Sequence, residues 1–585
     1  YYTNKDILSF LKIPKEEAEK LLSPLTSGRK ATQIESLKKG ISRWRVDTYL
    51  SESLRPRLVR PVGHYDPKLL LKVFRQNHVN ALIVQILGLL TLIGLGLLID
   101  NPYFRIPAGT SIFILAAVVA AVSGATLYWF GRWTLLVLVL FLLTINFLST
   151  FPMFNHQNKA YGLDYNGERP IYDYNTINQQ LHPDTLAKDK ATTIQRLNNW
   201  RLRFPSDEPP KMVVYCVSGG GMKAMVWVMK VIQECDYITD EALLPKSVLI
   251  TGASGGMIGA SYLRELYLQR EFGDQRQPID EVHIDKLSKD LLNSMAFTIV
   301  SNDLFLPWLK FEYEGYTYQK DRAYVFEKQL IENTDGLLEK PLSAYRVPEQ
   351  QGITPMVLLT PYIVNDGRQL MISPHGVSYM TTAPIGHSNP GTVEMDAVDF
   401  GRFFKKQGAE DLRFASALRM SATYPYILPN VNMPTIPSIE VMDAGLRDNY
   451  GIGSATRFIQ VFQDWIVENT SGVIMIQVTS LNKIDAIDQN DTKSLYTSIV
   501  NPLGVAGQIL SLQDYELDKS IGFVYDLLGP ENFEVVRFVY KPNKNNPRAS
   551  VTFHLTNSEK EDILSAMNNK ENQAALLQLK SALQN

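Results

Sequence analysis

Three long runs of apolar residues constrain the fold of this chain more than any other feature of its sequence. They cover residues 81–99, 110–130 and 133–151, and none of them contains a charged side chain. Crossing a bilayer core takes about 20 helical residues, and each run has about that length. Buried helices of a large soluble core are the alternative, but such helices usually keep a polar stripe. We therefore expect a transmembrane region over residues 80–152.

The segment before these runs, residues 1–79, is polar and basic, with six Lys and Arg residues between Arg55 and Arg75. Positive charge beside a span favours the cytoplasmic side and attracts lipid headgroups. Three spans would then place the following domain on the opposite side, although large domains weaken this rule. An ordinary solvated surface is the alternative. Because the chain starts at Tyr1 rather than Met, we expect further sequence upstream.

Charge, cysteine content and motifs argue against several classes of protein. Lys and Arg number 58 against 60 Asp and Glu, so the net charge of -2 gives no reason to expect a nucleic-acid partner. Cys216 and Cys235 are too few for a disulfide framework or a zinc site, and we expect structural roles for both. The sequence has no zinc-protease or EF-hand motif, so we expect neither a metal nor a cofactor.

After a connector over residues 153–210, which contains one predicted helix near 184–203, short apolar strands alternate with helices. This alternation predicts an α/β domain with a partly parallel sheet over residues 211–585. The predicted elements are strands at 212–217 and 247–251, helices at 222–238 and 257–268, and a hairpin of 356–364 and 369–373 around Asn365-Asp366-Gly367-Arg368.

A candidate nucleophile follows the second predicted strand. Residues 252–256 read Gly-Ala-Ser-Gly-Gly, which fits the G-x-S-x-G elbow that lifts a serine hydroxyl above the edge of a sheet. An apolar strand before Ser254 and small residues after it are the setting that this elbow needs. A glycine-rich turn with an incidental serine is the alternative.

A second glycine cluster, Gly219-Gly220-Gly221, also lies between a predicted strand and a predicted helix. Glycines let the backbone approach a ligand closely, and amides at a helix N-terminus favour a negative oxygen. We therefore interpret the three glycines as a candidate oxyanion hole. A nucleotide-phosphate loop is disfavoured, because neither glycine spacing of such loops is present.

A third element, Asp443-Ala444-Gly445, completes a recognisable order of motifs. Together with the glycine loop and its following Lys223, the serine elbow, and the segment 417–425 with its proline, it resembles the patatin-like phospholipases. The resemblance covers roughly residues 212–478. It implies a three-layer α/β/α domain, a Ser-Asp catalytic dyad, and calcium-independent hydrolysis of lipid esters.

Carried over by position, the resemblance makes Ser254 the nucleophile, Asp443 its activating base, and Gly219, Gly220 and Gly221 the oxyanion amides. Two residues depart from the family pattern. Ala224 stands where the family usually has glycine after the basic residue, and Ala444 stands where it usually has the glycine after the aspartate. Both replacements are small, so they bear on the geometry of the loops rather than on the activity.

The substrate and two alternative functions remain open. Phospholipid or a related lipid ester is the expected substrate, and the aromatic segment 294–313 is either an acyl channel or ordinary core. An α/β-hydrolase esterase would instead use a Ser254-Asp443-His554 triad, in the chain order of that fold. A non-catalytic membrane scaffold is the other alternative, against which the intact motif residues argue.

Overall fold

The computed structural model describes residues 48–51, 53–58, 67–104, 106–148, 150–151, 157–382, 395–424, 427–480, 515–543 and 551–584. The chain divides into two compact units, one of Tyr1–Leu98 with Leu115–Thr134 and one of Ile99–Ile114 with Leu135–Asn585. Most of the predicted basic segment, residues 1–47, lies outside the described residues. A short antiparallel pair, β1 (Thr48–Leu50) and β2 (Pro56–Leu58), belongs to the first unit.

Three helices coincide with the predicted apolar runs: α4 (Pro67–Leu97), α5 (Ala108–Phe130) and α6 (Thr134–Leu148). Two stretches, Ala108–Leu127 and Gly131–Leu148, are long and apolar enough to cross a membrane, and almost none of their side chains is buried. The apolar part of α4 covers only Ile83–Leu97, which is shorter than the predicted span 81–99 and short for a bilayer core. The expectation about sidedness, which needed three spans, therefore loses its basis.

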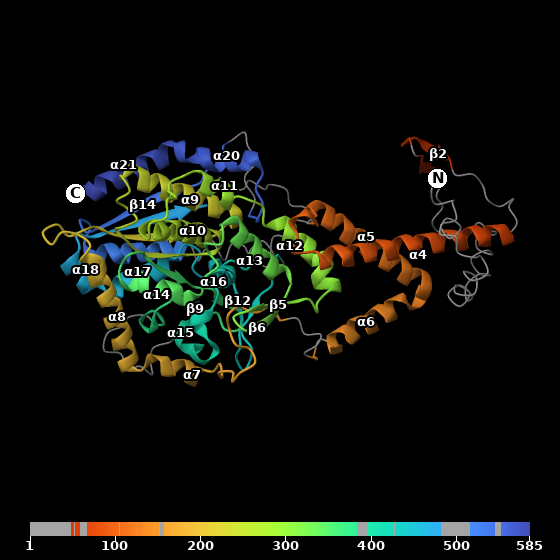
Figure 1. Cartoon of the computed structure of the whole chain (residues 1–585), viewed down its shortest axis with the longest axis horizontal. Coiled ribbons are helices and arrows are strands. Elements are labelled where there is room, and N and C mark those ends of the chain that lie inside the picture. Colours follow the sequence, from red (N-terminus) through yellow and green to blue (C-terminus); the bar gives the residue numbers. More distant parts are fainter. Residues whose placement is uncertain are drawn as a thin grey trace, which may run out of the picture. The chain divides into compact units, whose positions relative to one another are not determined.

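A five-stranded parallel sheet forms the centre of the second unit (Figure 1). Its strands, in spatial order, are β14 (Phe533–Val539), β13 (Val473–Thr479), β3 (Met212–Val217), β4 (Ser247–Gly252) and β7 (Met356–Leu359). Strands β3, β4 and β13 are buried along their whole length, as strands covered by helices on both faces must be. The predicted α/β class with a parallel sheet is confirmed.

Apart from α6, the described helices of the second unit lie around this sheet. They are α7 (Tyr174–Asn178), α8 (Pro183–Arg201), α9 (Gly221–Ile238), α10 (Ser254–Glu271), α11 (Val282–Leu287), α12 (Leu292–Thr298), α13 (Arg322–Asn333), α14 (Arg346–Gln350), α15 (Phe400–Phe403), α16 (Phe414–Ser421), α17 (Ile452–Val461), α18 (Gln463–Asn469), α20 (Asn557–Ser565) and α21 (Lys570–Gln584). Figure 1 shows α9, α20 and α21 on one side of the sheet and α8, α17 and α18 on the other.

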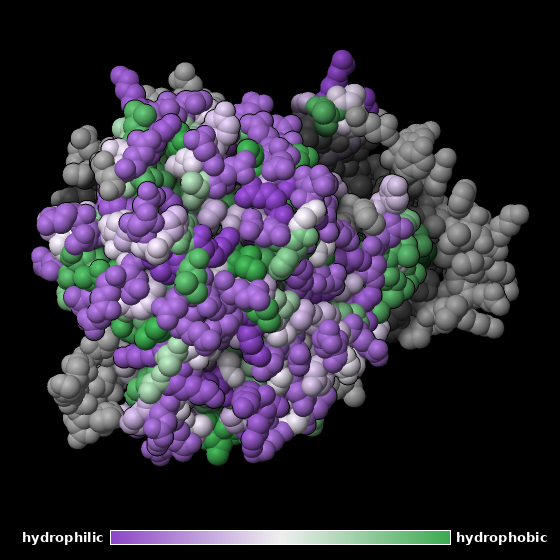
Figure 2. Space-filling model, turned by 60° about the vertical axis from the view of Figure 1, so that its left-hand side comes forward, coloured by the Kyte–Doolittle hydropathy of each residue, from purple (hydrophilic) through white to green (hydrophobic). Residues whose placement is uncertain are grey.

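Side chains from the two faces of the sheet fill two separate hydrophobic clusters. Val213 and Tyr215 of β3 pack with α9 and α10 in one cluster, while Met212 and Val214 pack with α8 and α17 in the other. This alternation follows from the two-residue period of a strand. The molecular surface seen in Figure 2 is mostly hydrophilic with scattered hydrophobic residues, as is usual for a protein surface.

Asp443 directly follows a strand of a second sheet, which also has five strands. Its order is β10 (Ala397–Asp399), β9 (Gln369–Met371), β8 (Tyr362–Ile363), β12 (Glu440–Met442) and β11 (Val431–Asn432). Strands β8 and β9 pair antiparallel around the predicted turn. The predicted strand 356–364 is divided, however, because β7 joins the parallel sheet and β8 joins this one. The division falls next to Pro361, which has no amide proton to donate to a ladder.

Candidate active site

Ser254 lies on a sharp turn from strand β4 into helix α10. The serine is the first residue of α10 and has a φ of 50°, a conformation that side chains other than glycine rarely adopt. Gly252 has a φ of 153°, and a Cβ placed there would lie 2.0 Å from the Val217 carbonyl oxygen. The predicted strand-turn-helix setting is therefore present, and Ser254 holds the strained position of a nucleophile elbow.

Glycines of α10 let the glycine-rich loop come against the start of this helix. A Cβ on Gly255 would lie 1.9 Å from the Gly221 carbonyl oxygen, and one on Gly256 would lie 2.2 Å from that of Ser218. Both distances are too short for any side chain. The approach places Gly219 beside the serine, because a Cβ on Gly219 would be 3.1 Å from the Ser254 Cβ.

Asp443 follows β12, and the Ser254 hydroxyl is near enough to its carboxylate to act on its pKa. Its Oδ1 accepts a hydrogen bond of 2.8 Å from the Gly445 amide, and its own amide donates to the Thr423 carbonyl oxygen at 3.2 Å. Burial raises the pKa of Asp443 to about 6, while the Gly445 amide and Ser254 act to lower it. The carboxylate is thus a stronger base than an exposed aspartate and still ionised at neutral pH.

The three predicted oxyanion amides differ in their hydrogen bonding. The Gly219 amide donates to Asn449, with distances of 3.1 Å to Oδ1 and 3.2 Å to the carbonyl oxygen. Within the described part of the chain, the amides of Gly220 and Gly221 donate to no acceptor. Gly220 and Gly221 have φ values of 139° and 61°, which require glycine, and they open helix α9. These two amides therefore differ from that of Gly219 in having no acceptor among the described residues.

Asn449 and Ser480 hold the glycine-rich loop in place, and sequence reasoning gave neither of them a role. Asn449 fixes the Gly219 amide, and the hydroxyl of Ser480, just after β13, donates to the Gly219 carbonyl oxygen. The Ser480 amide also donates to the Ser218 hydroxyl at 2.8 Å. The one available signal was that Asn449 lies six residues after Asp443; Ser480 had none.

His554, the third residue of the alternative triad, pairs elsewhere. Its Nδ1 lies 2.6 Å from Asp290 Oδ1, and its side chain is about half exposed. Among the described residues, no imidazole hydrogen-bonds to Ser254 or Asp443. Residues 551–556, which include His554, form no strand, and the Thr556 side chain caps α20.

The remaining candidate residues take structural positions. Lys223, after the glycines, is fully buried, with its ammonium 5.9 Å from the centre of the Tyr540 ring. Both cysteines are buried, and burial raises the pKa of each thiol well above its usual range. No group of three or more His, Cys, Asp or Glu residues suited to a metal occurs in the described residues.

The aromatic segment 294–313 is part core and part surface. Met295 and Phe297 are buried, whereas Leu304 and Trp308 are more than half exposed. The buried members belong to the packing of α12.

A parallel sheet with a serine on a strained strand-to-helix turn defines an α/β domain of the kind that serine ester hydrolases use. Residues 215–456 match the family described as patatin-like phospholipase, so the chain contains a domain of this family. The match supports lipid acyl hydrolysis as the class of activity of this domain. No curated protein sequence matches it.

Several solved structures are similar at low sequence identity. Human GIVD cytosolic phospholipase A2 matches with 11% identity and a TM-score of 0.33, covering 71% of this chain and 68% of that one. Its complex with methyl gamma-linolenyl fluorophosphonate matches with 14% identity and a TM-score of 0.33, covering 68% and 64%. VipD from Legionella pneumophila matches with 12% identity and a TM-score of 0.25, covering 65% and 67%.

Proposed function

We propose that this protein is a membrane-anchored serine hydrolase that cleaves the carboxylic ester bonds of phospholipids or related lipids. In this proposal Ser254 is the nucleophile and Asp443 is the base. The observation that carries it is that the hydroxyl of a serine on a strained elbow acts directly on the pKa of the buried Asp443 carboxylate, while no imidazole among the described residues bonds to either group.

The chemistry needs few groups. As the Ser254 oxygen attacks the ester carbonyl, Asp443 accepts the hydroxyl proton, which makes a poor nucleophile effective. Negative charge then develops on the carbonyl oxygen, where the Gly220 and Gly221 amides and the N-terminus of α9 stabilise it. Asp443 then gives this proton to the oxygen of the departing alcohol, so that the C–O bond breaks, an acyl-serine remains and the carboxylate is restored. A water molecule, deprotonated by the same carboxylate, attacks the acyl carbon; the bond to the serine oxygen breaks, the fatty acid leaves, and the proton passes from Asp443 to Ser254.

Anchoring through α5 and α6 rests on their exposed apolar surface. Helices of a soluble core bury most of their side chains, whereas 6% of the first candidate span and none of the second is buried. Exposing surfaces of this size to water is costly, and a lipid environment removes that cost. A bilayer also brings the domain close to its proposed substrate.

Labelling with a fluorophosphonate tests the proposal. We expect the wild-type chain to react and Ser254→Ala to lose both labelling and ester hydrolysis, because the reagent bonds to an activated serine oxygen. Ser261→Ala is the matched control, since Ser261 is also a buried serine of α10. Labelling of Ser254→Ala at the wild-type level would refute the assignment.

A further inference from the structure

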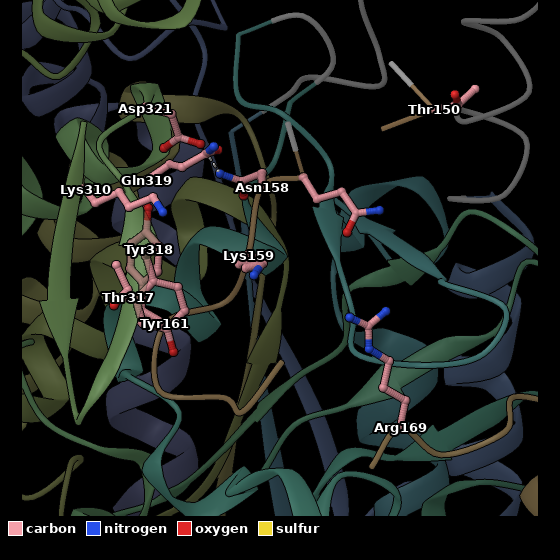
Figure 3. A pocket seen from close by; sticks show the side chains of 11 residues that line it. Thr150, Asn158, Lys159, Tyr161, Arg169, Lys310, Thr317, Tyr318, Gln319 and Asp321 are labelled. Carbon is pink, nitrogen blue, oxygen red and sulfur yellow. Dashed lines mark hydrogen bonds between the residues drawn. The ribbon is translucent and has the colours of Figure 1, made fainter. Parts of the chain in front are cut away.

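A polar pocket of about 400 Å³ lies beside the β5–β6 hairpin (Lys310–Tyr313 and Tyr316–Gln319) in the second unit. Three cationic side chains line it, Lys159, Arg169 and Lys310, and Figure 3 shows Lys159 between the other two. They come from separate segments, Lys310 from β5 and the other two from the chain before α7. The fold therefore gathers positive charge that the sequence disperses.

These cations lack carboxylate partners. Among the described residues, none of the three forms an ion pair, and the polar contacts of Lys159 and Arg169 go to Tyr165, through its ring at 4.7 Å and its carbonyl oxygen at 3.2 Å. Burial, followed by repulsion from Arg169 and Lys310, lowers the pKa of Lys159. A bound anion would relieve this repulsion.

Asp321 is the one carboxylate among the described residues that line the pocket, and it already accepts hydrogen bonds from other groups. Its Oδ1 accepts from the amides of Ala323 and Tyr324 at 3.0 Å, which caps α13, and its Oδ2 accepts from the Asn158 side chain at 2.7 Å. Three cations against one carboxylate leave the pocket with an excess of two positive charges. Such an excess favours a ligand with negative charge.

The position of the pocket favours a lipid source for that ligand. Thr150, which also lines it, lies two residues after the end of the apolar helix α6. On the other side, Lys159 forms a β-bridge with Asn432 of β11, which pairs with the strand that leads to Asp443. The pocket is thus lined by one residue just beyond a candidate membrane helix and by another that bridges to the sheet of the proposed catalytic base.

We propose that this pocket binds a phosphate-bearing anion through Lys159, Arg169 and Lys310. Guanidinium and ammonium groups are the usual partners of phosphate oxygens. An anionic phospholipid headgroup and free phosphate share this chemistry. The site is separate from the ester chemistry, so binding there does not depend on Ser254.

Binding to the full chain in detergent micelles, followed by native mass spectrometry, tests the proposal. The probes are an ether-linked phosphatidic acid, which no esterase cleaves, the corresponding dialkylglycerol without phosphate, and inorganic phosphate. The variants are Lys159→Gln with Lys310→Gln, and Lys310→Gln alone in case the double variant fails to fold. Lys541→Gln is the control, because Lys541 lies outside the pocket and pairs with Glu571.

We expect each lost charge to weaken phosphatidic acid binding about tenfold, with the control unchanged and the dialkylglycerol equally weak on all proteins. Inorganic phosphate that displaces the lipid at equal concentration would identify a free-phosphate site, and lipid that resists it would identify a headgroup site; both support the proposal. Equal lipid affinity of Lys310→Gln and wild type, or no binding of either phosphate probe to wild type, would overturn it.

Discussion

Burial and hydrogen bonding act in opposite directions on the pKa of the Asp443 carboxylate. Burial prevails and raises its pKa to about 6 from a usual 3.8. The proposed base would work only when ionised, so we expect kcat/KM for a soluble ester to fall about tenfold per pH unit below about 6 and to level off above it. A pH profile from 4.5 to 8 checks this, and a flat profile would contradict it.

The raised pKa of Asp443 also makes the free energy of unfolding depend on pH. Because the folded protein binds this proton more tightly than the unfolded chain, the contribution of Asp443 is fully present below pH about 4 and is lost as the pH rises through about 6. We therefore expect the difference in unfolding temperature between wild type and Asp443→Asn to become smaller as the pH falls across this range, which thermal unfolding measures.

The sequence predicted the candidate site residues that stand in a recognisable local motif. Ser254 sits in a motif with an apolar strand before it, and the family resemblance pointed to Asp443, 189 positions further on. Asn449 and Ser480 stand in no such motif. Their importance comes from contacts with Gly219 made by segments more than 200 residues away, which no local pattern encodes.

At the scale of the elements, the close approach of α10 to the glycine-rich loop leaves no room for a side chain on Gly255. Gly255→Ala would set a Cβ against the Gly221 carbonyl oxygen, so the loop must move, and the proposed oxyanion amides must move with it. We expect a loss of at least about 100-fold in kcat, the effect of removing one oxyanion donor. Turnover of a soluble ester measures it.

Gly401→Ala in α15 is the matched control, because its nearest neighbour would lie 3.5 Å away, an ordinary contact. We expect near wild-type turnover there. Wild-type turnover in Gly255→Ala would show that the loop is not held as described.

Whether a strand could be predicted from the sequence depended on its length. Strands β3 and β4, buried on both faces, gave continuous apolar runs that were found. Strands β8, β11 and β12 have only two or three residues, too few for any period to show. The second sheet, which positions Asp443, was therefore missed apart from its hairpin.

For the whole molecule, the exposed apolar surface of α5 and α6 predicts how the protein behaves in extraction. We expect it to sediment with membranes, to resist release by high salt or alkaline carbonate, and to need detergent, because water would otherwise contact both helices. Recovery of the intact chain in the soluble fraction after carbonate treatment would refute the anchor and leave the ester chemistry untouched.

The most direct test of the central claim compares Asp443→Asn with His554→Ala in the hydrolysis of one soluble ester, with thermal unfolding to confirm that both fold. A base that acts directly on Ser254 predicts that Asp443→Asn lowers turnover by about 10²–10⁴-fold. His554, paired with Asp290 and half exposed, should change turnover less than about threefold when replaced. A His554→Ala protein that folds normally but loses activity as heavily as Asp443→Asn would contradict the dyad.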